Sequence, residues 1–185
     1  MNKQFMNSAR VARQVGFTLI ELIVVIVILG ILAATALPKF ADLGSEARAV
    51  SMNAAKGSFE TVSSTAHGRF LIGTNTSYNF DGVTVTMLGG YPDATATTVQ
   101  AAGLDNVANY HTFANATATV IAATATTPAI PAKSVVVIPK SVKDTAAAVS
   151  CFVSYTNTSV AAAVGPPAVA ATSVAPVIAA TTTTC

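Results

Sequence analysis

The residue whose placement most needs a chemical explanation is Glu21, a carboxylate within an apolar segment. It follows the sequence Phe17-Thr18-Leu19-Ile20 and precedes an uncharged run from Leu22 to Leu37. A charge at the centre of an apolar helix costs about 2.5–3.5 kcal/mol on membrane-insertion scales, so it is rarely found there without a partner. If the chain is cut between Gly16 and Phe17, the new amino group lies four residues before this carboxylate. A charge pair is therefore one explanation of Glu21, and its positive partner would exist only after such a cleavage.

The two histidines are the candidates for acid–base catalysis near neutral pH. His67 is predicted near the end of a helix, where a cation interacts favourably with the helix dipole, so we interpret it as a capping or surface residue. His111 lies beside Tyr110 in a predicted strand, and no Ser, Cys or carboxylate pattern around it indicates a catalytic triad or a metal site. We predict no catalytic residue and no enzymatic activity.

Three aspartates, Asp81, Asp93 and Asp105, could contribute to a calcium site. They lack a tight ligand spacing, so we predict solvated turn residues instead. Gly89-Gly90 lacks the context of a phosphate-binding loop. The sequence therefore predicts no metal site and no cofactor. Three matches to the N-glycosylation sequon are interpreted as chance in an Ala- and Thr-rich chain: Asn75-Thr76-Ser77, Asn115-Ala116-Thr117 and Asn157-Thr158-Ser159.

The distribution of charge argues against a specific nucleic-acid partner. Only 10% of the 185 residues are charged, and the formal net charge is +2. Residues 1–16 contain three basic residues and no acid, so residues 17–185 carry seven basic and eight acidic groups. A nearly neutral body has no clustered basic face of the kind that binds a phosphate backbone.

A single long helix is predicted to position Glu21. It runs from Phe17 to about His67, around 75 Å, with looseness near Pro38. Residues 17–37 are apolar on all sides, whereas residues 38–67 are amphipathic and should pack on a globular domain. Two apolar stripes follow steps of three and four residues: Phe40, Leu43, Ala47, Val50 and Ala54, and then Met52, Ala55, Phe59, Val62 and Ala66.

Residues 68–185 are predicted to form a β-rich head. The polar segment from Gly68 to Asn79 indicates a loop that leaves the helix, and Asp81-Gly82 indicates a turn before a half-buried strand. Gly89-Gly90-Tyr91-Pro92 predicts a break in regular secondary structure. Strands are predicted at residues 83–87, 110–113, 118–122, 134–138 and 149–155. Together these elements predict an α+β roll, in which a small antiparallel sheet packs against the long helix.

The two cysteines, Cys151 and Cys185, bound a low-complexity segment. After Asn157 the chain is rich in Ala and Thr, and it cannot bury enough surface to order itself unaided. An even number of cysteines behind an export-like N-terminus favours a disulfide over two free thiols. Closing the loop 151–185 would stabilise the fold by roughly 3–4 kcal/mol in the chain-entropy model. The bond would tie the tail back onto a strand.

The residues of the N-terminal segment are compatible with three interpretations. A secretory signal peptide has the same basic start, apolar centre and Ala34-Thr35-Ala36 end, but Glu21 and the length of the apolar run argue against it. A plain membrane anchor fits Phe17 to Leu37, about 31 Å as a helix, with the N-terminus cytoplasmic. It also leaves Glu21 unexplained. The third interpretation is a leader cut after Gly16.

The third interpretation is supported by a family resemblance. The sequence GFTLIELIVVIVILGILAATALPKF resembles the class III signal and N-terminal helix of type IV pilins, a highly specific motif. The resemblance implies that residues 1–16 are a leader removed by prepilin peptidase, that Phe17 is N-methylated, and that Glu21 is the family's near-invariant acid. Pro38 falls where type IVa pilins usually carry a proline. The segment from Pro38 to Ser58 is similar to the mannose-sensitive haemagglutinin (MSHA) branch of type IVa pilins.

The resemblance implies a structural subunit rather than a catalyst. Its expected partners are copies of itself in a helical homopolymer, prepilin peptidase and the pilus assembly machinery in the inner membrane, together with an unknown host or surface receptor. The expected location is the inner membrane and then an extracellular pilus, which serves adhesion, biofilm formation and in some cases motility. Type IV pilins commonly carry a C-terminal loop bounded by a disulfide, and Cys151 and Cys185 match it.

Three other functions remain open on the sequence. A pseudopilin of a type II secretion system shares the whole N-terminal motif, although the major pseudopilin typically uses calcium where this chain has two cysteines. A minor pilin is equally compatible with the motif. A protein of a different class, a singly anchored cell-surface binding protein, would keep or lose an ordinary signal, and its mature form would not begin with N-methyl-Phe17.

Overall fold

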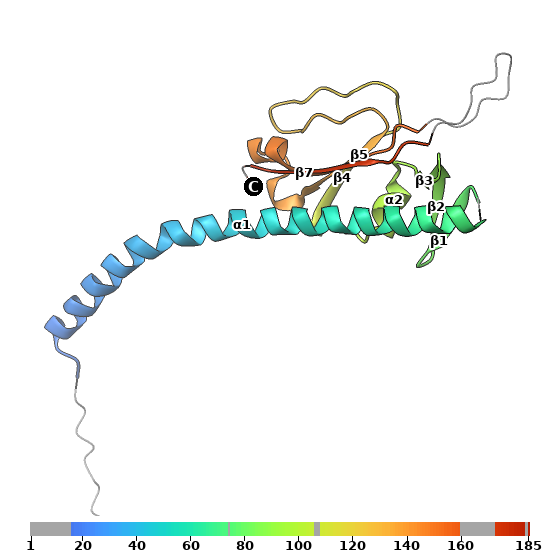
Figure 1. Cartoon of the computed structure of the whole chain (residues 1–185). Coiled ribbons are helices and arrows are strands. Elements are labelled where there is room, and N and C mark those ends of the chain that lie inside the picture. The colour runs from blue at the N-terminus through green and yellow to red at the C-terminus, as the bar shows by residue number, and fades with distance from the viewer. Residues whose placement is uncertain (1–15, 74, 106–107, 160–172, 184) are drawn as a thin grey trace, which may run out of the picture. The chain divides into compact units, whose positions relative to one another are not determined.

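The computed structural model describes residues 16–73, 75–105, 108–159, 173–183 and 185 (Figure 1). The chain divides into two compact units, residues 1–42 and 43–185. Helix α1 (Leu19–Gly73) contributes to both units. In the first unit, Leu19–Leu37 has a mean hydropathy of 2.8 over 19 residues and is by length and composition able to cross a membrane.

Helix α1 is longer than the sequence indicates. We expected it to end near His67 and a loop to span residues 68–79, but α1 continues to Gly73 and strand β1 occupies Ser77–Phe80. The extension is held by contacts with β1. The Tyr78 hydroxyl donates to the carbonyl oxygen of Arg69, and the Arg69 guanidinium donates to Asn79 O and lies 4.8 Å from the ring centroid of Phe80. These contacts join the last turns of α1 to β1.

A three-stranded antiparallel sheet follows the helix, in the order β1-β2-β3. Strand β2 spans Val83–Leu88 and β3 spans Tyr91–Pro92. Both connections are two-residue turns, and all four turn residues have positive φ. The turn at Asp81-Gly82 was predicted, whereas the predicted break at residues 89–92 is a turn at Gly89-Gly90 followed by strand β3. At Gly90 a Cβ atom would lie 2.9 Å from the Phe70 ring, so this turn requires glycine. The short helix α2 (Ala96–Ala101) comes next and was not predicted.

A second antiparallel sheet has four strands in the order β4-β5-β6-β7. Its strands are β4 (Tyr110–Asn115), β5 (Ser134–Pro139), β6 (Cys151–Thr156) and β7 (Val177–Thr182). Two short 3₁₀ helices, η1 (Lys140–Val142) and η2 (Ala146–Ser150), connect β5 to β6. The α+β class is confirmed, but the described residues form two sheets where we predicted one.

Four of the five predicted strands exist and one does not. Residues 118–122 form part of a loop whose backbone is tied by a single bridge between Ile121 and Ile130. The cause is Asn115, a buried residue at the end of β4. Its Nδ2 donates to the carbonyl oxygens of Thr119 and Pro131, and its Oδ1 accepts from Thr117. These side-chain bonds replace the strand ladder that alternation alone would predict.

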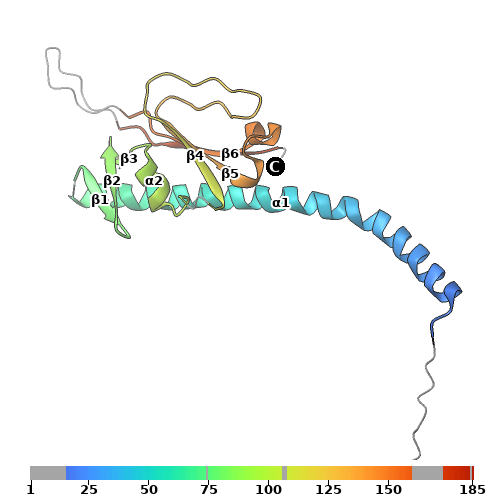
Figure 2. The ribbon, with the colours of Figure 1, turned by 180° about the vertical axis from the view of Figure 1, so that it is seen from behind.

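The core of the second unit lies on both faces of the four-stranded sheet. Figures 1 and 2 show α1 along one face of this sheet and the loop between β4 and β5 on the other. The buried stripe of α1 is the second of the two predicted stripes: Met52, Ala55, Phe59, Val62 and Ala66. All six residues of β5 are buried, which explains its uninterrupted apolar sequence. Phe59 packs on Tyr155 of β6, with 5.5 Å between ring centroids.

Two polar side chains on and after β6 join the two sheets. The Tyr155 hydroxyl donates to the carbonyl oxygen of Pro92 at 2.7 Å, and burial raises the pKa of this hydroxyl. Asn157, which is fully buried, donates from Nδ2 to the carbonyl oxygens of Leu88 and Pro92. The end of the β2–β3 hairpin therefore has its carbonyl groups satisfied by the second sheet.

The C-terminal segment is ordered by a strand as well as by a disulfide. Cys151 and Cys185 are bonded, and β7 pairs with β6 over its whole length, from Cys151 opposite Thr182 to Thr156 opposite Val177. Arg48 on α1 donates from Nε to the backbone oxygen of Cys185. Part of the segment expected as a loop is thus an edge strand, while residues 160–172 lie outside the described residues.

Because Phe59 lies on the buried face of α1 and Val50 on its exposed face, alanine substitutions at these two positions should differ in their effect on the free energy of unfolding. Phe59→Ala should lower the free energy of unfolding by about 3–5 kcal/mol, because it opens a cavity beside Tyr155. Val50→Ala, at a residue that is 67% exposed, should change it by less than about 0.5 kcal/mol. Both are measured by chemical denaturation of the full chain in detergent, followed by tyrosine fluorescence. Equal losses would contradict the burial of this face.

Candidate functional site

The candidate processing site lies just before helix α1. Gly16 and Phe17 are both outside the helix and exposed, and the Phe17 side chain is 93% exposed. A peptidase needs an extended, accessible backbone, which this pair provides. Residues 1–15, which complete the predicted leader, lie outside the described residues.

Glu21 has a partner within its own chain that the sequence analysis missed. Its Oε2 accepts a hydrogen bond from the backbone N–H of Thr18 at 2.9 Å and another from the Thr18 hydroxyl at 2.8 Å. In return, the backbone N–H of Glu21 donates to the Thr18 hydroxyl oxygen at 3.3 Å. This is a capping box, in which the residue before the helix and the third helical residue satisfy each other's free donors. The signal was present as Thr18-Leu19-Ile20-Glu21, the T-x-x-E pattern.

The capping box leaves part of the Glu21 carboxylate available. Both bonds from Thr18 go to Oε2, and no hydrogen bond to Oε1 is found among the described residues. A carboxylate has about four acceptor positions on its two oxygens, so the group can bind Thr18 and a second donor at once. Its charge also lies in the first turn of α1, where a negative group is favourable to the helix dipole. The site can therefore hold one cationic donor from outside the chain.

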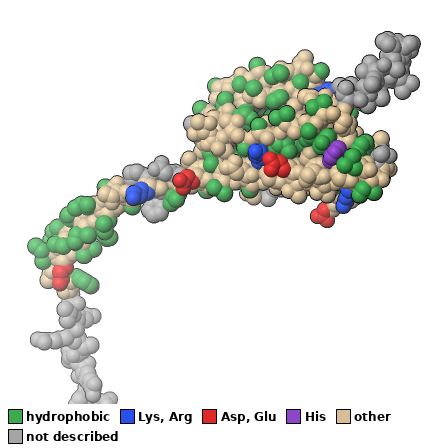
Figure 3. Space-filling model, viewed as in Figure 1, with side chains coloured by type: hydrophobic (Ala, Val, Ile, Leu, Met, Phe, Trp, Pro, Cys, Tyr) green, Lys and Arg blue, Asp and Glu red, His purple; other side chains and the backbone are tan. Residues whose placement is uncertain are grey.

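The helix that follows presents apolar side chains in every direction. From Leu19 to Leu32 the large apolar residues are between 45% and 74% exposed, and none of the span Leu19–Leu37 is buried within the chain. Figure 3 shows hydrophobic side chains covering the visible face of this segment. Soluble monomers rarely expose contiguous apolar patches beyond a few hundred Å², so this surface must be covered by lipid or by protein.

The other candidates for chemistry have structural partners. His67 donates from Nδ1 to the carbonyl oxygen of Gly90 at 2.9 Å and stacks on Tyr91, with 4.1 Å between ring centroids. It is interior to α1 rather than near its end, so the expected dipole contact is wrong. His111 packs edge-on against Phe113 in β4. Burial, and then the charge of Lys143, lower the pKa of His111.

The predicted turn aspartates do not form a metal cluster in the part of the chain that is described. Asp81 lies in the β1–β2 turn, and the Asp93 carboxylate accepts the backbone N–H of Ala94. No group of three or more His, Cys, Asp or Glu side chains among the described residues could share a metal ion. Two of the three sequon asparagines, Asn115 and Asn157, are buried with their side-chain nitrogens hydrogen-bonded, whereas Asn75 is exposed.

Comparisons with known proteins concern the N-terminal segment. Residues 12–37 match the family described as the prokaryotic N-terminal methylation motif. Over 42 residues the chain is 55% identical to the type IV narrow pilus major component PilA5 of Thermus thermophilus, a match that spans 23% of this chain and 36% of the relative. No solved structure matches the chain. The two matches support a type IV pilus-related protein, and the chain spans about a third of the length of the relative it matches.

The capping box predicts that Thr18 stabilises the start of α1. Thr18→Val removes the hydroxyl from both of its bonds, so the first turn should fray and amide hydrogen exchange there should rise about fivefold, equivalent to about 1 kcal/mol. Thr18→Ser keeps the hydroxyl and should exchange at the original rate. Exchange is measured by NMR of the full chain in detergent micelles. Identical rates in the two variants would show that the box contributes nothing.

Proposed function

We propose that this chain is the structural subunit of a type IV pilus, most similar to the major pilins of the MSHA type. The observation that carries the proposal is the coincidence, within six residues, of an accessible Gly16-Phe17 bond, a preorganised carboxylate and the methylation motif. The apolar surface of Leu19–Leu37 supplies the reason for assembly, since copies of the helix can cover one another. A contact that does not close on itself generates an open helical array.

In this proposal, cleavage of the leader creates the amine of Phe17, which is the positive partner of Glu21. Prepilin peptidase removes residues 1–16 and N-methylates Phe17, and methylation keeps the new amine cationic. The amine cannot exist in the unprocessed chain, so Glu21 of an unprocessed subunit has only Thr18 as a partner among the described residues. The proposal assigns the amine of Phe17 in one subunit to Oε1 of Glu21 in its neighbour.

The pairing would act on register more than on affinity. In the low dielectric of a bundle of apolar helices, an unpaired charge is costly, whereas a paired one roughly balances its loss of hydration. Subunits displaced along the bundle would leave both charges unpaired, so one axial position is favoured. The apolar contacts themselves are non-directional and would permit many positions.

The remaining parts of the chain have assigned places in this proposal. Residues 17–37 form the membrane helix and then the filament core, the rest of α1 up to Gly73 is its amphipathic half, and the residues after α1 form the head. Before assembly the prepilin stays in the inner membrane with its leader in the cytoplasm, and the assembly machinery transfers it into an extracellular filament. The exposed head would carry adhesion and biofilm formation, and in some filaments motility.

A type II secretion pseudopilin or a minor pilin is the second candidate. Both would share the processing site and Glu21. The bonded pair Cys151–Cys185 favours a pilin over the major pseudopilin, which typically holds its C-terminal part with calcium.

The processing step is tested on the protein from its natural host. Mass spectrometry of the mature chain should find N-methyl-Phe17 as the first residue. Gly16→Val should block cleavage and leave residues 1–16 attached, while Gly68→Ala, at an exposed helical glycine, should leave processing unchanged. A mature chain that begins elsewhere or keeps its leader would exclude the pilin and pseudopilin functions together.

The charge pair is tested separately from the capping box. Glu21→Gln preserves the acceptor oxygen for Thr18, because Gln also serves in capping boxes, but it removes the charge. It should leave cleavage intact and reduce the filament yield by at least tenfold, since breaking a buried pair costs about 3–5 kcal/mol. Glu46→Gln, at an exposed acid later on α1, is the matched control and should assemble normally.

Electron microscopy of sheared fibres, with quantification of the subunit in them, gives the readout for both variants. Thr18→Val should assemble better than Glu21→Gln if the charge governs register. Abundant normal filaments from Glu21→Gln would rule out the proposed pairing, and loss of filaments from Glu46→Gln would show that the effect is not specific to Glu21.

A further inference from the structure

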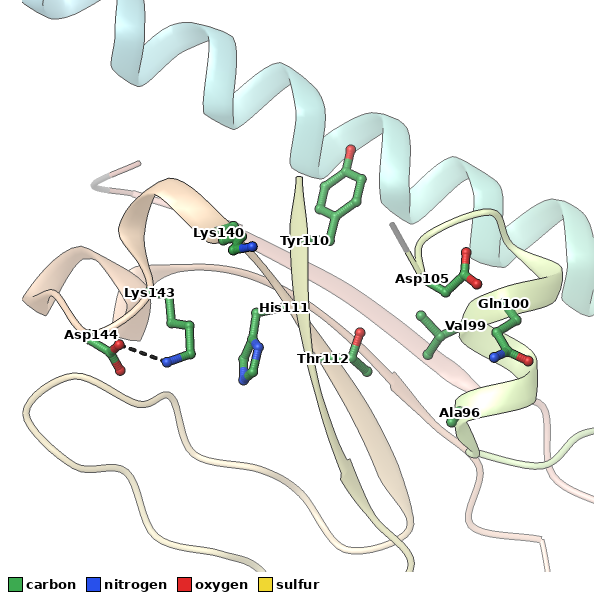
Figure 4. Close-up of a pocket in the computed structure, with 10 residues that line it drawn as sticks. All are labelled: Ala96, Val99, Gln100, Asp105, Tyr110, His111, Thr112, Lys140, Lys143 and Asp144. Carbon is green, nitrogen blue, oxygen red and sulfur yellow. Dashed lines mark hydrogen bonds and ion pairs between the residues drawn. The ribbon is translucent and has the colours of Figure 1, made fainter. Parts of the chain in front are cut away.

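The head carries a cleft that the filament function does not use. It has a volume of about 720 Å³, within the range of about 300–1,000 Å³ that is usual for small-molecule sites. Three elements line it: α2 and the residues after it, the first half of β4, and η1 with the turn that follows (Figure 4). All of its lining residues lie in the second unit.

One side of the cleft is cationic. Lys140 and Lys143 contribute positive charge there, and both act on His111 strongly enough to lower its pKa, after the larger effect of burial. Asp144 acts in the opposite direction and pairs with Lys143 at 2.7 Å. Figure 4 shows His111 and Lys143 beside each other on the same side of β4. An anion placed between these groups would meet two ammonium groups and an imidazole that it would help to protonate.

The other side of the cleft offers hydrogen-bonding groups without a positive charge. Asp105 supplies a carboxylate, Gln100 supplies an amide that can both donate and accept, and Val99 forms an apolar surface between them and β4. The cleft is therefore bipolar, and an anion alone would use only half of it.

Between the two sides of the cleft, the backbone of β4 adds one hydrogen-bond donor and one acceptor. Strand β4 is at the edge of its sheet. Lys140 N–H donates to Asn109 O, and because bonded and non-bonded pairs alternate along an antiparallel ladder, Thr112 points its backbone N–H and C=O away from β5. Thr112 lines the cleft, so these groups lie on its open side.

We propose that this cleft binds an acidic saccharide, a ring of hydroxyl groups that carries one carboxylate. The carboxylate lies against Lys140, Lys143 and His111. The hydroxyl groups exchange hydrogen bonds with Asp105, Gln100 and the Thr112 backbone, and the less polar face of the ring lies on Val99. Each hydroxyl is both a donor and an acceptor, which suits a surface where both kinds of group alternate.

The test uses the full chain in detergent micelles and D-glucuronate as the probe. The two histidines serve as reporters by NMR, because His111 lines the cleft and His67 does not. Glucuronate should shift the His111 ring signals saturably, leave those of His67 unmoved, and raise the pKa of His111. D-glucose, which keeps the hydroxyl groups but lacks the carboxylate, and acetate, which has the carboxylate alone, should each bind at least tenfold more weakly.

Variants locate the site. Lys143→Gln removes one cation and leaves Asp144 unneutralised, so glucuronate binding should weaken by tenfold or more. Lys56→Gln is the matched control, since Lys56 also pairs with a neighbouring acid, Glu60 at 3.6 Å, but lies on α1 outside the cleft. It should bind glucuronate normally. Binding to the original chain should tighten as the pH falls through the pKa of His111, because the imidazolium adds a positive charge.

Three results would overturn the proposal. They are no saturable shift of His111 at about 10 mM glucuronate, equal binding of acetate or glucose, and equal effects of Lys143→Gln and Lys56→Gln. The inference does not depend on the filament function. The cleft is tested on the unassembled subunit, so its failure leaves the proposed pilin function intact, and a failure of processing or assembly leaves the cleft intact.

Discussion

The constraint on which the structure depends is the unbroken apolar surface of Leu19–Leu37. No element of the described chain covers it, so the first unit is incomplete without lipid or other protein. Hydrophobic contact alone gives such a helix neither position nor direction. Glu21 and the Thr18 box at its start are the polar features that can supply both. The second unit has its own hydrophobic core.

The sequence was most informative where a local pattern has one physical meaning. The second of the two predicted stripes, Met52 to Ala66, is the buried face of α1, and Asp81-Gly82 is a turn as predicted. Boundaries set by distant contacts were not predictable. Tyr78 extends α1 past His67 by bonding to Arg69, and Asn115 turns residues 118–122 into a loop by bonds to Thr119 and Pro131. In both cases the deciding partner is a side chain whose reach the sequence does not encode.

The candidate sites also differ in whether a local pattern or a distant contact determines them. The roles of Gly16, Phe17 and Glu21 came from the family resemblance and stay predictions. The T-x-x-E box was present in the sequence but was overlooked in favour of the charge. The cleft could not be found in advance. Its lining residues come from separate segments between Ala96 and Asp144, and the pairing of β4 with β5 brings His111 near Lys143.

The disulfide between Cys151 and Cys185 also sets an order of events. In a reducing compartment β7 is held only by its ladder with β6, by the contact of Arg48 with Cys185, and by the packing of its half-buried side chains. An oxidising compartment adds a covalent lock to the last strand of the sheet. The oxidation state of Cys151 and Cys185 therefore depends on the compartment that the head occupies. The last strand of the sheet is therefore covalently fixed only where the two thiols can be oxidised.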